Sequence, residues 1–78
     1  MKIEVLGTGC AKCADLLERT KAAVAKSGKF VQLNKVEDVM EIMNHGVAST
    51  PALVIDDEVK CAGRLPGVEE ILKWIEGK

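Results

Sequence analysis

The chain alternates between strand-like segments and segments with helical periodicity, and this order limits the folds open to its 78 residues. Short runs of β-branched and aliphatic residues indicate strands, whereas apolar residues spaced three and four apart indicate helices. We expect strands at 3–6, 30–36, 52–55 and 58–62, a helix from the Cys10–Cys13 region to Ser27, and helices at 39–43 and 68–75. The predicted order is therefore βαβαββα.

The first helix has the clearest pattern. Its apolar or small residues recur at intervals of three and four and would form one face, namely Cys13, Leu16, Leu17, Thr20, Ala23 and Val24. Charged side chains fall largely on the opposite face. Gly28 is suited to the left-handed conformation that ends many helices. We therefore expect an amphipathic helix that ends at Ser27.

The connections between the strands predict a mixed sheet. Strands 3–6 and 30–36 are joined through a helix, so we expect them to be parallel with a right-handed crossover. The two-residue turn Asp56-Asp57 requires strands 52–55 and 58–62 to be antiparallel. The prediction is an α/β fold with a four-stranded mixed sheet and helices on both faces. This single domain would occupy residues 1–78 and leave nothing for a second one.

Composition excludes several classes of function. Eleven basic and 12 acidic side chains give a net charge of −1, and the aromatic residues are Phe30 and Trp74 alone. This balance favours neither nucleic acid nor an anionic membrane as a partner. No apolar run is longer than that of residues 52–55, which is far shorter than the roughly 20 residues that span a bilayer. Since the run 1–6 reaches Gly7 too soon for a signal-peptide core, we expect a cytoplasmic protein.

The chain has three cysteines, an odd number, and structural disulfides are rare in a reducing compartment. A small domain stabilised by disulfides is therefore disfavoured. Cys10 and Cys13 are three residues apart at the start of the first helix, where Cβ atoms lie about 5–6 Å apart. The helix dipole and Lys12 both favour a thiolate there. Cys13 is on the apolar face, whereas Cys10 precedes the helix among glycines. We therefore expect an accessible nucleophile, Cys10, and a shielded resolving thiol, Cys13.

Metal binding is the alternative use of such a pair. A structural zinc site needs four ligands, and His45 and Cys61, which would have to complete it, lie in different elements without paired spacing. Two thiolates would suit a carrier of monovalent copper better. That alternative implies a βαββαβ order that ends on a strand, whereas this chain is predicted to end on a helix. We expect no metal site.

The strand–CxxC–helix opening, a later Thr-Pro at the head of an apolar strand, a hairpin and a final helix together resemble the thioredoxin superfamily over essentially the whole chain. More narrowly, the chain is similar to small glutaredoxin-sized redox-active disulfide proteins of archaea and bacteria. The residues that carry this resemblance are Gly7-Thr8-Gly9-Cys10-Ala11-Lys12-Cys13, Gly46-Val47, Thr50-Pro51-Ala52-Leu53 and Gly63-Arg64. C-x-x-C is common by itself, but its combination with the Thr-Pro and this element order is specific.

The resemblance implies a thiol–disulfide oxidoreductase that acts as an electron carrier and needs no cofactor beyond a Cys10–Cys13 disulfide. It implies a cis peptide bond before Pro51, which would pack against the cysteine pair. The backbone of Thr50 would pair with an extended substrate segment, and Gly63 would lie near the cysteine loop. The implied partners are protein disulfides and an NAD(P)H-dependent donor similar to thioredoxin reductase. We expect a monomer.

The chain departs from ordinary thioredoxins in its active-site motif. Gly9 stands where a tryptophan is usual, and Ala11-Lys12 replaces Gly-Pro between the cysteines. The acid that thioredoxins bury to assist the resolving thiol has no counterpart in the middle of the first strand's partner. The basic and acidic residues with which glutaredoxins bind glutathione have no clear positions either. These differences bear on the redox potential, the substrate and the electron donor.

Other residues have structural interpretations. We expect Cys61 to share a strand face with Val59 and to point into the core, as free cysteines often do. Met40 and Met43 fit the core side of their helix. His45 suits the C-terminal end of the same helix. Arg64 is compatible with a surface charge or with a contact to a partner.

Overall fold

The protein is described by a computed structural model that covers residues 1–7 and 11–77. Within these residues the predicted βαβαββα order is confirmed. The elements are β1 (Lys2–Leu6), α1 (Ala11–Ser27), β2 (Gln32–Val36), α2 (Val39–Asn44), β3 (Ala52–Ile55), β4 (Glu58–Ala62) and α3 (Val68–Glu76). None of the helices in the described ranges is long and apolar enough to cross a membrane.

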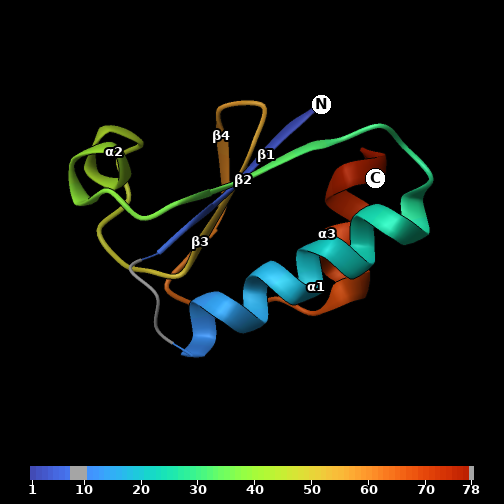
Figure 1. Ribbon diagram of the computed structural model, residues 1–78, viewed down its shortest axis with the longest axis horizontal. Helices are drawn as coiled ribbons and strands as arrows, with labels where there is room; N and C mark the ends of the chain where they lie inside the picture. The colour runs from blue at the N-terminus through green and yellow to red at the C-terminus, as the bar shows by residue number, and fades with distance from the viewer. Residues whose placement is uncertain (8–10, 78) are drawn as a thin grey trace.

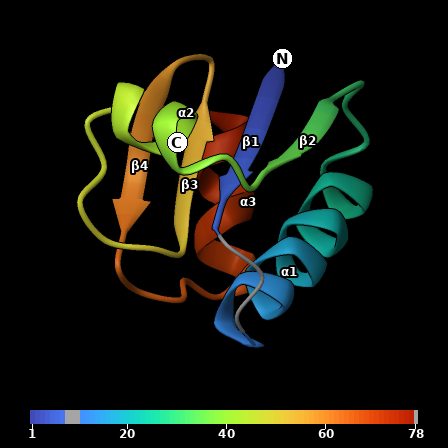
Figure 2. The same cartoon turned by 60° about the vertical axis from the view of Figure 1, so that its left-hand side comes forward.

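The four strands form one mixed sheet in the order β2-β1-β3-β4. β1 is parallel to β2 and antiparallel to β3, and β3 is antiparallel to β4. Helices α1 and α3 lie side by side against one face of the sheet, and α2 lies on the other side (Figures 1 and 2). The prediction of a four-stranded mixed sheet with helices on both faces is therefore correct.

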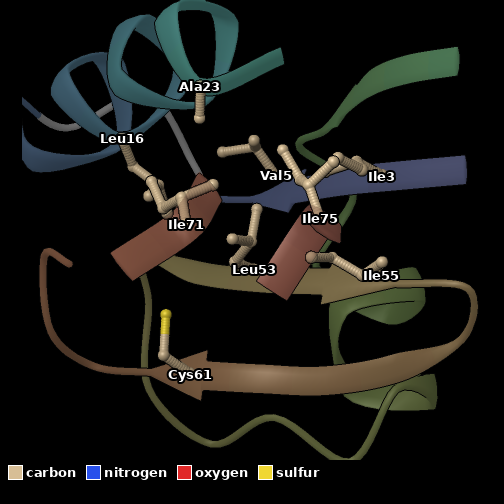
Figure 3. Close-up of a cluster of buried hydrophobic side chains, with 9 residues drawn as sticks. All are labelled: Ile3, Val5, Leu16, Ala23, Leu53, Ile55, Cys61, Ile71 and Ile75. Atoms are coloured by element: carbon tan, nitrogen blue, oxygen red, sulfur yellow. The ribbon is translucent and has the colours of Figure 1, made fainter. Parts of the chain in front are cut away.

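The larger core lies between the sheet and the helices α1 and α3 (Figure 3). Its buried side chains come from β1, β3, β4 and both helices, namely Ile3, Val5, Leu16, Ala23, Leu53, Ile55, Cys61, Ile71 and Ile75. Alternation along β1 sends Ile3 and Val5 to this face. Each fully buried aliphatic side chain contributes about 1.5–3 kcal/mol to stability. This core fixes α1, and with it Cys13, against the sheet.

A smaller core lies under α2 and consists of Leu6, Val36, Ile42, Val47, Ala52 and Val54. Asp38 begins the helix, because its Oδ1 accepts a hydrogen bond of 2.8 Å from the backbone N–H of Met40. The prediction that Met40 and Met43 face the core is wrong, since they are 67% and 63% exposed. The helix has six residues and meets the sheet through Ile42, so its methionines remain in solvent.

The β3–β4 hairpin contains a bulge that changes the face of two residues. The pairing shifts between Leu53 and Val54, so Leu53 lies opposite Cys61 and Val54 lies opposite Val59. Lys60 is the extra residue, and Val59 and Cys61 therefore point to opposite faces. The expectation that they share a face is wrong. Cys61 points into the core, as predicted, and is 7% exposed.

The ends of the elements lie within one residue of the predicted bounds except at β2. Gly28 follows α1 with φ 68°, and both residues of the Asp56-Asp57 turn have positive φ (48° and 66°), as tight hairpin turns require. β2 begins at Gln32, two residues later than expected. Phe30 lies outside the strand and is fully exposed.

Candidate functional site

One end of the sheet brings together segments that are far apart in sequence. The last residue of β1 lies opposite the first residue of β3, so the chain leaves β1 where it enters β3. The backbone N–H of Gly7 donates to the carbonyl of Val36 at 2.9 Å. The backbone N–H of Gly63 donates to the carbonyl of Pro51, also at 2.9 Å. Gly7, which the cysteine motif follows in sequence, therefore lies at the same end of the sheet as the Thr-Pro segment.

Cys13 is the third residue of α1 and is completely buried. It stands at the start of the buried face of that helix, which Leu16, Thr20 and Ala23 continue. Its side chain lies directly against Gly7, since a Cβ added at Gly7 would come within 2.9 Å of the Cys13 Cβ. The shielded position predicted for this thiol is the one that the structure shows.

Of the other residues of the Cys10–Cys13 motif, the structure describes Ala11 and Lys12. The predicted nucleophile, Cys10, lies outside the described residues together with Thr8 and Gly9. In sequence it immediately precedes α1. Lys12 is exposed in the first turn of that helix. Its predicted effect on the thiolate stays a prediction.

The Thr50–Pro51 peptide bond is cis. Pro51 is buried and Thr50 is exposed beside it. Gly63 has φ 78°, and a Cβ added there would lie 2.9 Å from the Cβ of Ser49. Gly63 is thus held between the Pro51 carbonyl and Ser49, next to the Thr-Pro segment, where a larger residue would be crowded.

An apolar groove of about 590 Å³ extends from Thr50 towards α2. Its lining comes from α2 and from the segment that leads to β3, namely Val39, Ile42, Met43, Gly46, Val47, Ala48 and Thr50. Val39 is 56% exposed and Met43 63%. The six-residue helix therefore leaves apolar surface open beside the predicted substrate-binding residue.

Arg64, the charged residue next to Gly63, forms an ion pair with Glu70 of the same chain. The Arg64 guanidinium donates two hydrogen bonds to the Glu70 carboxylate, at 3.0 and 2.7 Å, and lies 5.8 Å from the Trp74 ring centroid. These hydrogen bonds, and to a smaller degree the charge of Arg64, hold the pKa of Glu70 below its ordinary value against the opposing effect of desolvation. Arg64 is an exposed surface charge anchored to α3.

The residues considered for zinc lie apart. The Nε2 atom of His45 is 3.4 Å from Glu4 Oε2 on the α2 side of the sheet, whereas Cys61 points into the core on the other side. Within residues 1–7 and 11–77, no three His, Cys, Asp or Glu side chains gather in a way that could hold a metal ion. Glu4 is itself buried, and its Oε1 accepts no hydrogen bond from the described residues, although Lys2 Nζ lies 3.6 Å from it.

The sequence matches the thioredoxin domain family over residues 1–76. The chain belongs to this family. It is 37% identical to a thioredoxin of Methanothermobacter thermautotrophicus over 73 residues, which cover 94% of this chain and 95% of that protein. It is 40% identical to a thioredoxin of Methanocaldococcus jannaschii over 80 aligned positions, which cover 97% of this chain and 92% of that protein. The thioredoxin superfamily resemblance is confirmed, and the chain is a thioredoxin-like redox protein of the oxidoreductase class.

One feature of this thioredoxin-like site goes beyond the sequence expectation. Gly7 follows the predicted strand 3–6, and it also makes room for the Cys13 side chain. The glycine three residues before Cys10 is a usable sequence signal for this feature.

Proposed function

We propose that the protein exchanges a Cys10–Cys13 dithiol with the disulfides of other proteins. The observation that carries this proposal is the position of Cys13. It is buried at the start of α1 and lies against Gly7. The Thr50-Pro51 segment lies at the same end of the sheet. Family membership supports redox chemistry in general. The pair Cys10–Cys13 is the only arrangement of two cysteines at close spacing in the sequence.

The exchange has two steps. The Cys10 thiolate attacks one sulfur of the substrate disulfide, which forms a mixed disulfide and releases the first substrate thiolate. The Cys13 thiolate then attacks the Cys10 sulfur, which forms the Cys10–Cys13 disulfide and releases the second substrate thiolate. Two electrons pass to the substrate, and each released thiolate takes a proton from solvent. Burial of Cys13 suits this order, because a shielded thiol does not compete for the incoming disulfide.

Exposed Thr50 and the groove next to it support docking of an extended substrate segment. Backbone groups at the head of a strand can pair with an added strand, and pockets beside it can take alternate side chains. The groove is lined mainly by apolar side chains, including Met43, which adapts to different partners. We propose that Thr50, Pro51 and Gly63 form the docking surface and that Lys12 favours the Cys10 thiolate.

In the cell, the Cys10–Cys13 pair cycles between the dithiol and the disulfide. The redox-active disulfide serves as the whole redox centre, without a bound cofactor. An NAD(P)H-dependent donor similar to thioredoxin reductase returns the pair to the dithiol. The protein works as a monomer in the cytoplasm, where protein disulfides are its substrates.

The metal-carrier alternative has less support. It requires a βαββαβ order, whereas the described elements have the order βαβαββα, with α2 between β2 and β3. Titration with monovalent copper under reducing conditions separates the two functions. Tight stoichiometric binding by a protein that reduces no disulfide would favour the carrier.

The decisive assay follows reduction of a protein disulfide, with dithiothreitol as the electron source. We expect turnover by the wild type and none by Cys10→Ser. Cys13→Ser should accumulate a mixed disulfide with the substrate, visible by mass spectrometry. Cys61→Ala is the matched control, because it removes a cysteine from the core, and it should retain turnover. An inactive wild type, or an active Cys10→Ser, would refute the proposal.

A further inference from the structure

Gly7 leaves open a space that the Cys13 side chain fills. A Cβ added at Gly7 would lie 2.9 Å from the Cys13 Cβ and closer still to the Cys13 sulfur. Carbon atoms that are not bonded to each other pack about 3.5–4.0 Å apart, so no side chain at position 7 fits beside the thiol. Cys13 itself is completely buried. We call the space that the Cys13 thiol occupies against the Gly7 backbone the thiol seat.

Both walls of the thiol seat are fixed. Gly7 donates its backbone N–H to the carbonyl of Val36 at 2.9 Å, which ties it to the end of β2. On the other side, α1 is held against the sheet by Leu16 and Ala23 of the larger core. Protein interiors are close-packed, so neither wall moves away without a loss of stability. The position of the Cys13 sulfur therefore depends on which residue stands at position 7.

The Cys13 thiol has few alternative positions. A cysteine has one side-chain torsion with three staggered positions, and the position near +60° is rare in helices. The sulfur of Cys13, the third residue of α1, thus has two usual positions, and a methyl group at position 7 would exclude the one that it occupies. A disulfide forms only at a specific separation and orientation of the two Cβ atoms. A displaced Cys13 sulfur would therefore reach a partner sulfur less often.

Gly7 differs in this respect from the other described glycines. A Cβ at Gly63 would meet Ser49, and a Cβ at any of the others would meet nothing within 4 Å. Gly7 also does not have a positive φ, so its backbone conformation is open to other residues. Among the described residues, contact with Cys13 is therefore what requires a glycine at position 7.

We propose that Gly7 is a positioning residue for the second step of disulfide exchange, because the thiol seat holds the Cys13 sulfur where it can attack the Cys10 sulfur. This inference rests on the proposed function. In this step the Cys13 thiol gives its proton to solvent, its thiolate forms a bond to the Cys10 sulfur, and the bond between Cys10 and the substrate sulfur breaks. The electron pair leaves with the substrate sulfur, and the released thiolate takes a proton from solvent. Gly7 acts through Cys13.

Stopped-flow mixing of the reduced protein with Ellman's reagent separates the two steps. Attack by Cys10 releases the first coloured thiolate at a rate that depends on reagent concentration, whereas attack by Cys13 releases the second at a rate that does not. All variants carry Cys61→Ala, which leaves only the two motif cysteines. Circular dichroism is recorded first, and sucrose, which favours the folded state, is added to every sample if any variant is partly unfolded.

Gly7→Ala should slow the second phase about tenfold, because a small misplacement of a reacting atom has a large effect on its rate. The first phase should not change, since the Cys10 thiolate reacts with the reagent without Cys13. Ile55→Val is the matched control. Ile55 belongs to the same core as α1 but pairs with Ile3, at the end of β1 away from Gly7. This control loses stability through a small cavity and should change neither phase.

A second measurement tests the thiol seat without any exchange reaction. In a Cys10→Ser/Cys61→Ala variant, Cys13 is the only cysteine, and its alkylation by iodoacetamide is followed by mass spectrometry. With Gly7 in place, alkylation should be no faster than the unfolded fraction of the protein allows, and urea unfolding gives that fraction. Adding Ile55→Val should raise the alkylation rate only in proportion to the unfolded fraction.

The outcomes distinguish this inference from the proposed function. A Cys61→Ala parent without a concentration-independent second phase would refute the proposed function, and this inference with it. A parent with that phase, and an equal second phase in Gly7→Ala, would overturn the role of Gly7 alone. Equal slowing by Gly7→Ala and Ile55→Val would also overturn it, because loss of stability would then explain the effect. Rapid alkylation of Cys13 in the folded protein would show that the thiol seat is open, which overturns the inference whether or not Gly7→Ala folds.

Discussion

The backbone of Gly7 lies against the side chain of Cys13, and the two residues fit together only because position 7 has no Cβ. A Cβ there would meet the Cβ of Cys13 at 2.9 Å and its sulfur at a still shorter distance. Gly7 also donates its N–H to Val36 at 2.9 Å, so it is fixed to β2. The Cys13 thiol is therefore buried between its own helix and the end of the sheet.

Gly7→Ala should destabilise the protein by about 1–3 kcal/mol, because the added methyl group overlaps a side chain that is completely buried. Urea unfolding, followed by circular dichroism, measures the loss. Gly67→Ala is the control, since a Cβ at Gly67 meets nothing within 4 Å. Because Gly67 is the N-cap of α3, where alanine is less favourable than glycine, this control should lose no more than about 1 kcal/mol, less than Gly7→Ala. Equal effects of the two substitutions would contradict the close contact.

Gly63→Ala should cost more stability than Gly46→Ala. Both glycines have positive φ, 78° and 77°, so both variants suffer the strain of about 1–2 kcal/mol that a side chain meets there. Only the methyl at Gly63 is crowded, by the Ser49 Cβ at 2.9 Å. Ser49→Gly should therefore recover the excess cost of Gly63→Ala but leave the strain. Equal unfolding midpoints for the two alanine variants would show that the crowding is absent.

The elements that the sequence predicted well are those whose patterns are local. Helical spacing from Cys13 onward, Gly28 at the end of α1 and the Asp56-Asp57 turn each depend on a few neighbouring residues. The apolar segment 52–55 was expected to be a strand, and the structure has it as β3, which lies between β1 and β4. The mixed sheet follows from these elements and the handedness of the crossover.

The features that the sequence did not predict depend on tertiary pairing. The bulge at Lys60 reverses the faces of Val59 and Cys61 through a shift relative to β3, which the β4 residues alone do not reveal. Met43 is exposed because α2 is short and meets the sheet through Ile42. The candidate site was predicted as far as its motif residues, but the close fit of Gly7 against the Cys13 side chain depends on how α1 packs on the sheet.

The Arg64–Glu70 pair should make stability depend on pH in the acid range. Because the folded pKa of Glu70 is lowered from 4.5, the stabilisation is complete above that value and is lost as pH falls through the folded pKa. Glu70→Gln should therefore unfold at a lower urea concentration than the wild type at pH 7, and the difference should shrink below pH 4.5. Urea midpoints at pH 7, 5 and 3 measure it. A difference that stays constant over this range would contradict the charge pairing.

Cys61 should be a packing residue with an unreactive thiol. Burial raises the pKa of this thiol against the opposing charge of Arg64, and the residue is 7% exposed. In a Cys10→Ser/Cys13→Ser variant, where Cys61 is the only cysteine, iodoacetamide should label the native protein far more slowly than the urea-unfolded chain. Because the folded pKa is raised, the contribution of the protonated thiol to stability should decline as pH rises above 9.0. Equal labelling rates for the folded and unfolded chain would place Cys61 at the surface.

The central claim is that Cys10 and Cys13 form a reversible redox couple, and its reduction potential is the most direct test. A Cys61→Ala variant is equilibrated in glutathione buffers of stepped potential, trapped with acid and analysed by mass spectrometry. We predict a single two-electron transition with the loss of two hydrogens, absent from Cys10→Ser. A reduction potential of about −270 mV would indicate a reductant, and one of about −120 mV would indicate an oxidant. Two thiols that stay reduced, or that form only disulfides with glutathione, across the whole range would contradict the account.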